Sequence, residues 1–241
     1  FFSRLETGNY ANSRLYVGVM GQGLRSTIAM AWLMSATLQG VHELALDDKA
    51  TSDELDAYWT MVAYHNSKRE LGRITNATRD EIPARVKVYA SEEARERPSQ
   101  FDVMELKAHS ETPIPLARQK LSTRHSVAAP ALDIVPCTNI ISVGVDIDRL
   151  GLMVVNGQPK LTAEYIQASS RVGRGKVPGL VIACYSPSKP RDRSHYEAFR
   201  DFHERFYSFV SSIHRDFRCL APRRRTPHSP ILIALRHGAG L

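Results

Sequence analysis

Apolar and polar residues are grouped in blocks along this chain, and the blocks predict short strands that alternate with helices. The apolar runs at 150–155 and 179–185 are nearly continuous, which is typical of parallel strands covered on both faces. Shorter runs at 14–19 and 60–64 predict two more strands, and "RVKVYA" at 85–90 predicts another. The pattern therefore favours a protein built around a sheet.

Helical blocks fill the spaces between these strands. An apolar segment at 26–39 follows a glycine-rich turn and predicts a buried helix. A polar, acidic stretch at 47–58 predicts a loop, and the stretch at 91–129 predicts helix with loops. From residue 134 the chain continues as strand, strand, helix and strand. This alternation predicts a layered α/β domain with a mostly parallel sheet.

A different composition begins after residue 186. Pro187 and Pro190 predict a loop, and a helix follows whose aromatic residues recur every three or four positions. Those aromatic residues are Tyr196, Phe199, Phe202, Phe206 and Phe209. They favour a core or an interdomain seam over a surface that stacks on bases. We therefore divide the chain into a main domain at 1–186 and a helical extension with a basic tail at 187–241.

Charge and cysteine content narrow the class of protein. The net charge is +7 and the isoelectric point about 9.4, which is compatible with an anionic partner such as nucleic acid. The 3 cysteines lie far apart without a CxxC pair, so we expect no metal site, no disulfide framework and a reducing cytoplasm. No apolar run reaches the roughly 18 to 20 residues that cross a bilayer, so we expect no membrane partner.

The first residues, "FFSRLE", contain neither an initiator methionine nor the charged, apolar and small-residue pattern of a signal peptide. We therefore expect the sequence to be part of a longer protein or a processed product.

The segment "GVMGQGLRST" resembles a phosphate-binding loop only in part. Gly18 and Gly23 have the required spacing, but Leu24 stands where such a loop needs a lysine, and Arg25 comes one position later. Read as GxGxxS, the segment matches a dinucleotide fingerprint only loosely. A turn that leads into a helix is the favoured interpretation, with phosphate contact as the alternative.

The segment "TAEYIQASSRVGRG" carries the strongest candidate chemistry. Thr162 is expected to cap a helix, on which Gln167, Arg171 and Arg174 would share one face at positions i, i+4 and i+7. Two guanidinium groups and an amide on an open ledge suit a polyphosphate, because the planar fork of arginine matches phosphate oxygens. A solvated helix face with two surface arginines is the alternative interpretation.

The preceding segment, "CTNIISVGVDI", adds a second set of candidates. Gly144 permits close approach of a ligand, and Asp146 is able to accept hydrogen bonds from a ribose hydroxyl or, alternatively, to cap a turn. We expect both at the carboxyl-terminal edge of the sheet, where open α/β sheets bind ligands, and we expect the two arginines at the same edge.

Several of these strings resemble one family. "TNIISVGVDI" and "QASSRVGR" resemble motifs V and VI of superfamily 2 helicases, and "MVAYHNSKRELG" resembles their motif IV. The resemblance covers about 60–174, in the order found in the C-terminal RecA-like domain of that family. The longer string "RLGLMVVNGQPKLTAEYIQASSRVGR", followed by "KPRDRSHYEAF", is most similar to bacterial helicases of the DISARM phage-defence type. The resemblance implies a three-layer RecA-like domain.

The resemblance also implies roles at the nucleotide. Arg171 and Arg174 would reach across a cleft to ATP with Mg²⁺, which an N-terminal RecA-like domain of the same protein would bind, and Gln167 would sense the nucleotide. Gly144 and Asp146 would contribute to the same cleft.

A nucleic-acid surface is implied as well. Thr138, Asn66 and Ser67 match positions where family members touch the nucleic-acid backbone, here expected to be DNA. Such contacts are independent of base sequence and sensitive to salt.

These observations support three hypotheses. The favoured one is the C-terminal motor domain of an ATP-dependent helicase or translocase, inactive without a second domain that carries the phosphate loop and acidic box. The alternative is a non-catalytic helicase remnant that binds nucleic acid or protein, and the reading frame upstream of Phe1 would distinguish the two. A nucleotide-binding enzyme that uses "GVMGQGLRST" is the third.

Overall fold

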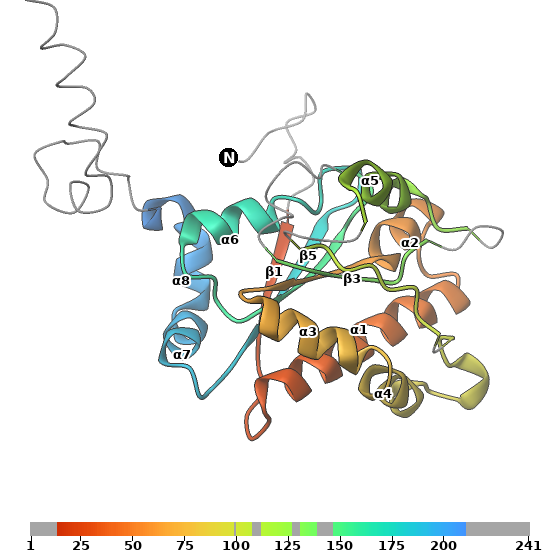
Figure 1. Ribbon diagram of the computed structural model, residues 1–241, viewed down its shortest axis with the longest axis horizontal. Coiled ribbons are helices and arrows are strands. Elements are labelled where there is room, and N and C mark those ends of the chain that lie inside the picture. The colour runs from red at the N-terminus through yellow and green to blue at the C-terminus, as the bar shows by residue number, and fades with distance from the viewer. Residues whose placement is uncertain (1–13, 99, 108–111, 127–130, 139–146, 211–241) are drawn as a thin grey trace, which may run out of the picture.

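A computed structural model of the chain describes residues 14–98, 100–107, 112–126, 131–138 and 147–210 (Figure 1). Its strands are β1 (Arg14–Met20), β2 (Met61–His65), β3 (Ile134–Cys137), β4 (Leu152–Asn156) and β5 (Gly179–Tyr185). They form one sheet in the order β1-β5-β4-β2-β3, and every pairing is parallel. The predicted parallel sheet is confirmed.

Strands β2, β3 and β4 are fully buried and β5 nearly so, because helices cover each side of the sheet, whereas β1 leaves Leu15 and Val17 exposed. One face packs against α5 (Ile114–Ser122), α6 (Thr162–Ser169) and α8 (Phe199–Glu204). The other face packs against α1 (Ser26–Leu46), α3 (Lys68–Ala77) and α4 (Glu81–Tyr89). Residues along β2 alternate between the two cores, with Val62 and Tyr64 in one and Met61 and Ala63 in the other. The three-layer α/β fold is therefore confirmed (Figure 1).

Two segments differ from the sequence prediction. The predicted strand at 85–90 belongs to α4, because Ile82 and Val86 lie one helical turn apart and both are fully buried. The predicted loop at 47–58 contains α2 (Ser52–Trp59). Thr51 and Glu54 form a capping box at its start, a signal that the acidic composition concealed.

The predicted extension after residue 186 is helical in its described part. It forms α7 (Pro190–Glu197), α8 and the short 3-10 helix η3 (Phe206–Phe209), with breaks at Ala198 and Arg205. Phe202 and Phe206 join the main core, which confirms the core interpretation for these two aromatic residues. The boundary at residue 186 remains a prediction, since the described part of the extension packs on the same core.

A sheet whose strands are all parallel has two distinct edges, which we name here. The amino edge is where the five strands begin, and the carboxyl edge is where they end. None of the helices in the described ranges is long and apolar enough to cross a membrane.

Candidate functional site

The segment with the two candidate arginines is a helix end followed by a turn. Helix α6 ends at Ser169, so Arg171 and Arg174 lie beyond it, and Gly173 adopts a φ of +66°. The predicted single helix face shared with Gln167 is therefore wrong, because the helix ends before Arg171 and the left-handed Gly173 redirects the backbone before Arg174. Gln167 and Arg174 are exposed, whereas Arg171 is half-buried.

The residues predicted to pack inward from α6 do so, but the predicted cap at the start of α6 is not present. Tyr165, Ala168 and Val172 are fully buried, as their spacing indicated. The N-cap position of α6 belongs to Leu161 and has no side-chain cap, so the predicted capping role of Thr162 is wrong.

The arginine-bearing turn, residues 170–174, lies at the amino edge. The Gly173 amide donates a hydrogen bond of 2.8 Å to the carbonyl of Leu150, two positions before β4 begins. We expected both arginines at the carboxyl edge, and that placement is wrong, because α6 follows β4 and runs back across the sheet. Gly144 and Asp146 lie outside the described residues.

Arg14, the first residue of β1, holds the arginine-bearing turn from the side. Its Nε donates to the carbonyl of Val172 at 2.7 Å, and a terminal nitrogen donates to the carbonyl of Ser170 at 3.0 Å. Arg174 donates from its own Nε to the same Ser170 carbonyl at 2.7 Å. Cations at a helix C-terminus satisfy carbonyl groups that have no partner within the helix. These bonds fix the backbone between the two candidate arginines.

A close contact between Gly173 and Gly179 also fixes the turn. A Cβ atom on Gly173 would lie 2.4 Å from the Gly179 nitrogen, closer than any real side chain approaches. Gly179 is the first residue of β5 and is buried, so the turn rests directly on the sheet. Glycine is needed at position 173 both for this approach and for the positive φ.

A buried arginine anchors the neighbouring segment at 147–150. Arg149 donates to Asp56 at 3.3 Å, to Thr60 Oγ1 at 2.7 Å and to the Leu121 carbonyl at 2.6 Å. The Arg149 and Asp56 side chains are each 6% exposed, so this ion pair is desolvated and must keep its partners to remain favourable. Burial lowers the pKa of Arg149, and the nearby Asp56 carboxylate opposes that shift.

Sequence reasoning missed Arg14, Asp56 and Arg149. Their partners are between 28 and 158 positions away, so no local spacing points to them. The one available signal was the presence of charged residues at the very ends of apolar runs.

The predicted nucleic-acid residues lie together at the carboxyl edge. Asn66 and Ser67 follow β2, and Thr138 follows β3, which pairs with β2. Ser67 caps α3 by accepting a hydrogen bond from the Glu70 amide at 3.2 Å, and Asn66 donates to the Asn156 carbonyl at 2.8 Å. Thr138 is only 6% exposed, so its side chain is covered within the structure.

A buried histidine lies next to these residues. His65, the last residue of β2, is fully buried, and burial lowers its pKa to about 4. Asn156 Nδ2 lies 3.2 Å from His65 Nδ1 and donates to it, so the proton of the neutral ring is on Nε2. Within the described part of the chain Nε2 has no hydrogen-bond partner. The histidine is therefore held neutral at neutral pH.

The loop of "GVMGQGLRST" also lies at the carboxyl edge, after β1. Its amides bond within the loop, from Gln22 to the Met20 carbonyl at 3.1 Å and from Leu24 to the Gly21 carbonyl at 3.4 Å. A phosphate-binding loop needs such amides to point at the ligand. The geometry therefore supports the turn interpretation.

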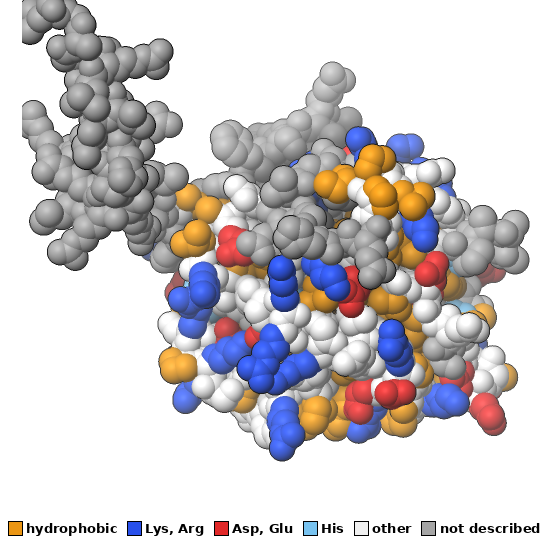
Figure 2. All heavy atoms as spheres, viewed as in Figure 1, with side chains coloured by type: hydrophobic (Ala, Val, Ile, Leu, Met, Phe, Trp, Pro, Cys, Tyr) orange, Lys and Arg blue, Asp and Glu red, His pale blue; other side chains and the backbone are white. Residues whose placement is uncertain are grey.

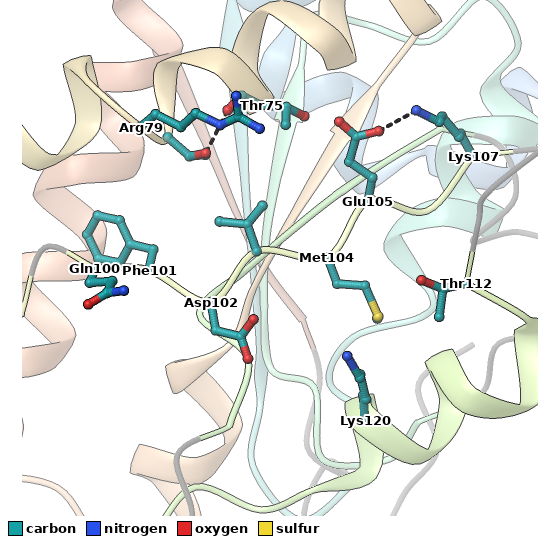
Figure 3. A pocket seen from close by; sticks show the side chains of 12 residues that line it. Thr75, Arg79, Gln100, Phe101, Asp102, Met104, Glu105, Lys107, Thr112 and Lys120 are labelled. Carbon is teal, nitrogen blue, oxygen red and sulfur yellow. Dashed lines mark hydrogen bonds and ion pairs between the residues drawn. The ribbon is translucent and has the colours of Figure 1, made fainter.

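A cavity of about 840 Å³ opens beside β3 (Figure 3). Among the described residues none of the candidates lines it, but the Thr138 amide bonds to the Leu106 carbonyl at 3.2 Å, between the lining residues Glu105 and Lys107. Arg79 reaches it from the turn after α3 and Lys120 from α5, while Lys107 pairs with Glu105 at 2.6 Å on the segment that bridges to β3. Because its walls carry both signs of charge, the cavity favours no one class of ligand.

The arrangement at the amino edge suits charge stabilisation rather than proton transfer. Two guanidinium groups are carried on a fixed backbone turn, and arginine stays charged at every physiological pH. Among the residues that the structure describes, no group of three metal-ligating side chains lies close enough to hold an ion. Two guanidinium groups at this edge are suited to binding an anion.

Comparison with known proteins supports the resemblance to helicases. Residues 103–176 match the family described as helicase conserved C-terminal domain. Over 213 residues the chain is 40% identical to the DISARM protein DrmA of Bacillus paralicheniformis (strain ATCC 9945a / NCIMB 11709 / CD-2). The match covers 87% of this chain and 19% of DrmA, so the chain spans about a fifth of that relative.

Two solved structures are similar to parts of this chain. The DUF1998 helicase MrfA bound to DNA gives a TM-score of 0.49 at 18% identity, over 79% of this chain and 23% of that one. Dbp5 of S. cerevisiae, bound to RNA and ADP BeF3, gives 0.47 at 12% identity, over 83% of this chain and 40% of that one.

Proposed function

The chain carries a C-terminal RecA-like domain of superfamily 2 helicases, and from this premise we propose that it is one half of an ATP-driven nucleic-acid motor. The other half would be an N-terminal RecA-like domain of the same protein, which would bind ATP with Mg²⁺. Opening and closing of the cleft between the two domains would move them along a DNA strand in the cytoplasm. The likeness to DISARM proteins supports a role in phage defence.

The observation that carries this proposal is the fixed turn at the amino edge. Arg171 and Arg174 are joined to a backbone that Arg14 and Gly179 hold in place. Preorganised cations of this kind stabilise charge on a phosphoryl group in transfer without reorganising during the reaction. Bound ATP supplies the scissile phosphoryl group, and Arg171 and Arg174 would bind its oxygens, with Gln167 beside them.

Asn66 and Ser67 would contact the nucleic-acid backbone from the opposite edge. An exposed loop and helix start at the end of a strand are typical positions for such contacts. Gly144 and Asp146 remain proposed nucleotide residues, and Thr138 remains a proposed nucleic-acid residue whose burial restricts it to its backbone or to a rearranged surface.

Substitution of Arg171 by alanine in the complete gene product tests the proposal. Because an arginine finger contributes roughly 10³- to 10⁵-fold in related reactions, we expect DNA-stimulated ATP turnover to fall about 1,000-fold. Binding of single-stranded DNA should change little, since the turn lies at the other edge of the sheet. Turnover equal to that of the unsubstituted protein would show that these arginines are surface charge.

A non-catalytic binding module is the second candidate function. Lys68 and Arg69, both exposed and directly after Ser67 at the carboxyl edge, favour it, because a nucleic-acid-binding surface needs no chemistry at the amino edge. In that case the complete gene product would bind DNA but hydrolyse ATP no faster in its presence.

A further inference from the structure

Lys and Arg side chains gather at the carboxyl edge beyond the residues discussed so far. Figure 2 shows them over the region between α3 and α7. Four of the five strands are followed by an exposed cation in the segment that comes next. We call these residues the basic face: Arg25, Lys68, Arg69, Lys160, Arg191 and Arg193, all of them exposed.

One ion pair joins the start of α7 to α3, and a buried carboxylate holds α7 on the neighbouring loops. Lys189 Nζ lies 3.0 Å from Glu70 Oε1, which joins the first turn of α3 to the residue before α7. Asp192, only 2% exposed, accepts hydrogen bonds from the amides of Gln158 and Ser186, both at 3.0 Å. The start of α7 is thus fastened to the loops after β4 and β5, and its arginines are held at the edge.

The acidic groups nearest to these cations are already engaged. Glu70 pairs with Lys189, and both oxygens of Asp192 accept backbone amides. Glu197, the last residue of α7, lies four positions after Arg193 and lines the same surface hollow. The carboxylates keep their charge in these contacts, but the local net charge stays positive and attracts polyanions, because five cations stand against Glu70, Asp192 and Glu197: Lys68, Arg69, Lys189, Arg191 and Arg193.

We propose that Arg191 and Arg193 extend the nucleic-acid track by binding the phosphate backbone of a DNA strand. The strand would pass from Asn66 and Ser67 over Lys160 to α7. Each guanidinium group is able to donate two parallel hydrogen bonds to phosphate oxygens, so Arg191 and Arg193, on different sides of α7, would each bind one phosphate group, and such contacts fix position without reading sequence. Helix α7 lies outside residues 103–176, so it adds a surface beyond the region that matches the helicase family. The inference rests on the proposed motor function.

The test measures how DNA affinity depends on salt in the complete gene product. A labelled single-stranded DNA oligonucleotide is titrated between 50 and 200 mM salt, with protein carrying Arg191→Gln and Arg193→Gln. Each lost phosphate contact should reduce the slope of log affinity against log salt by about 0.7, so the pair should reduce it by about 1.4. The ratio of the DNA affinity of the unsubstituted protein to that of the variant should then fall about sevenfold between 50 and 200 mM salt.

A matched control removes two exposed charges elsewhere. Lys87→Gln with Arg118→Gln takes them from α4 and α5, and should leave the slope unchanged. Equal melting temperatures would show that all variants are folded. Equal slopes for the α7 pair and the control pair would overturn the inference, and so would a reduced slope with RNA of the same sequence but not with DNA.

The proposed function has a separate point of failure. If the α7 pair binds DNA normally while Arg171→Ala abolishes turnover, only the present inference fails. If Arg171→Ala leaves turnover intact, the motor itself is wrong and this inference falls with it.

Discussion

The two edges of the sheet differ in how their arginines are held. At the amino edge the backbone around Arg171 and Arg174 is fastened by Arg14 and by the contact of Gly173 with Gly179. At the carboxyl edge the fastening lies beneath the surface, at Asp192, and the cations themselves are exposed.

This difference corresponds to two proposed roles, catalysis of phosphoryl transfer and binding of a phosphate backbone. Chemistry on a phosphoryl group needs groups fixed to within a fraction of an ångström, because misplacement is costly in rate. Binding a backbone of regularly spaced charges tolerates mobile side chains and depends on their number. Under the proposed function one sheet would serve both purposes, because its parallel strands create two edges with different surroundings.

The largest expected effect on stability comes from adding a side chain to Gly173, where the arginine-bearing turn contacts β5. Gly173→Ala places a Cβ 2.4 Å from the Gly179 nitrogen and forces a φ of +66° on a residue that disfavours it. We expect a loss of about 4 kcal/mol in the free energy of unfolding, measured by urea denaturation of the chain.

Gly72→Ala is the matched control for that substitution. Gly72 lies inside α3, and a Cβ there meets nothing within 4 Å. Helix propensity predicts a gain of about 0.5–1 kcal/mol. Equal effects of the two substitutions would contradict the account of the turn.

Removal of the Arg14 side chain should have a smaller effect on stability and a clear one on catalysis. Arg14→Met abolishes two charge-assisted hydrogen bonds, with an expected loss of about 2–3 kcal/mol in the free energy of unfolding. In the complete gene product the kcat for ATP should fall about tenfold with DNA affinity unchanged.

Arg14→Lys distinguishes positioning from bulk stability. A lysine ammonium lacks the planar fork that reaches two carbonyl groups, so it should restore part of the stability but little of the kcat. Full recovery of kcat by lysine would show that only a positive charge is needed at this position.

The smallest expected effect is the loss of stability at acid pH that comes from His65 at the carboxyl edge. The pKa of His65 is about 4 in the folded chain, below the ordinary 6.5, because burial disfavours the charged ring. The unfolded chain therefore binds this proton more readily, and stability present above pH 6.5 is lost as the pH falls toward 4. Between pH 7.5 and 5 the loss should be about 2 kcal/mol.

His65→Gln removes this contribution while keeping a side chain that can bond to Asn156. Urea denaturation of both proteins at the two pH values gives the comparison. The variant should lose about 2 kcal/mol less than the unsubstituted chain over this interval. Identical losses would place the acid sensitivity at other groups.

Much of the sheet could be predicted from the sequence because its strands are apolar on both faces. The range 179–185 coincides with β5, and the residues of β2 and β4 were recognised within one or two positions. Helix α4 was missed because Val86 and Val88 favour strands locally, and only packing against α1 reveals which of them is buried.

The candidate site was predicted less completely. Arg171 and Arg174 could be found because their spacing and the motif around them are local features. Their position at the amino edge could not, because it depends on where α6 ends, and that depends on the contact of Gly173 with a residue of another strand. The role of Arg14 could not be predicted either, because its partners Val172 and Ser170 lie far away in the sequence.

The pairing of β1 with β5 has a consequence for synthesis of the protein. Arg14 and Val172 are separated by 158 positions, so β1 leaves the ribosome long before its partner exists. At about 5–20 residues per second, that interval lasts roughly 10–30 s. During it α1 has no complete sheet to cover, and Met30, Met34 and Leu38, all fully buried in the finished fold, stay accessible to chaperones. The arginine-bearing turn thus takes its final place only after β5 has emerged and paired with β1.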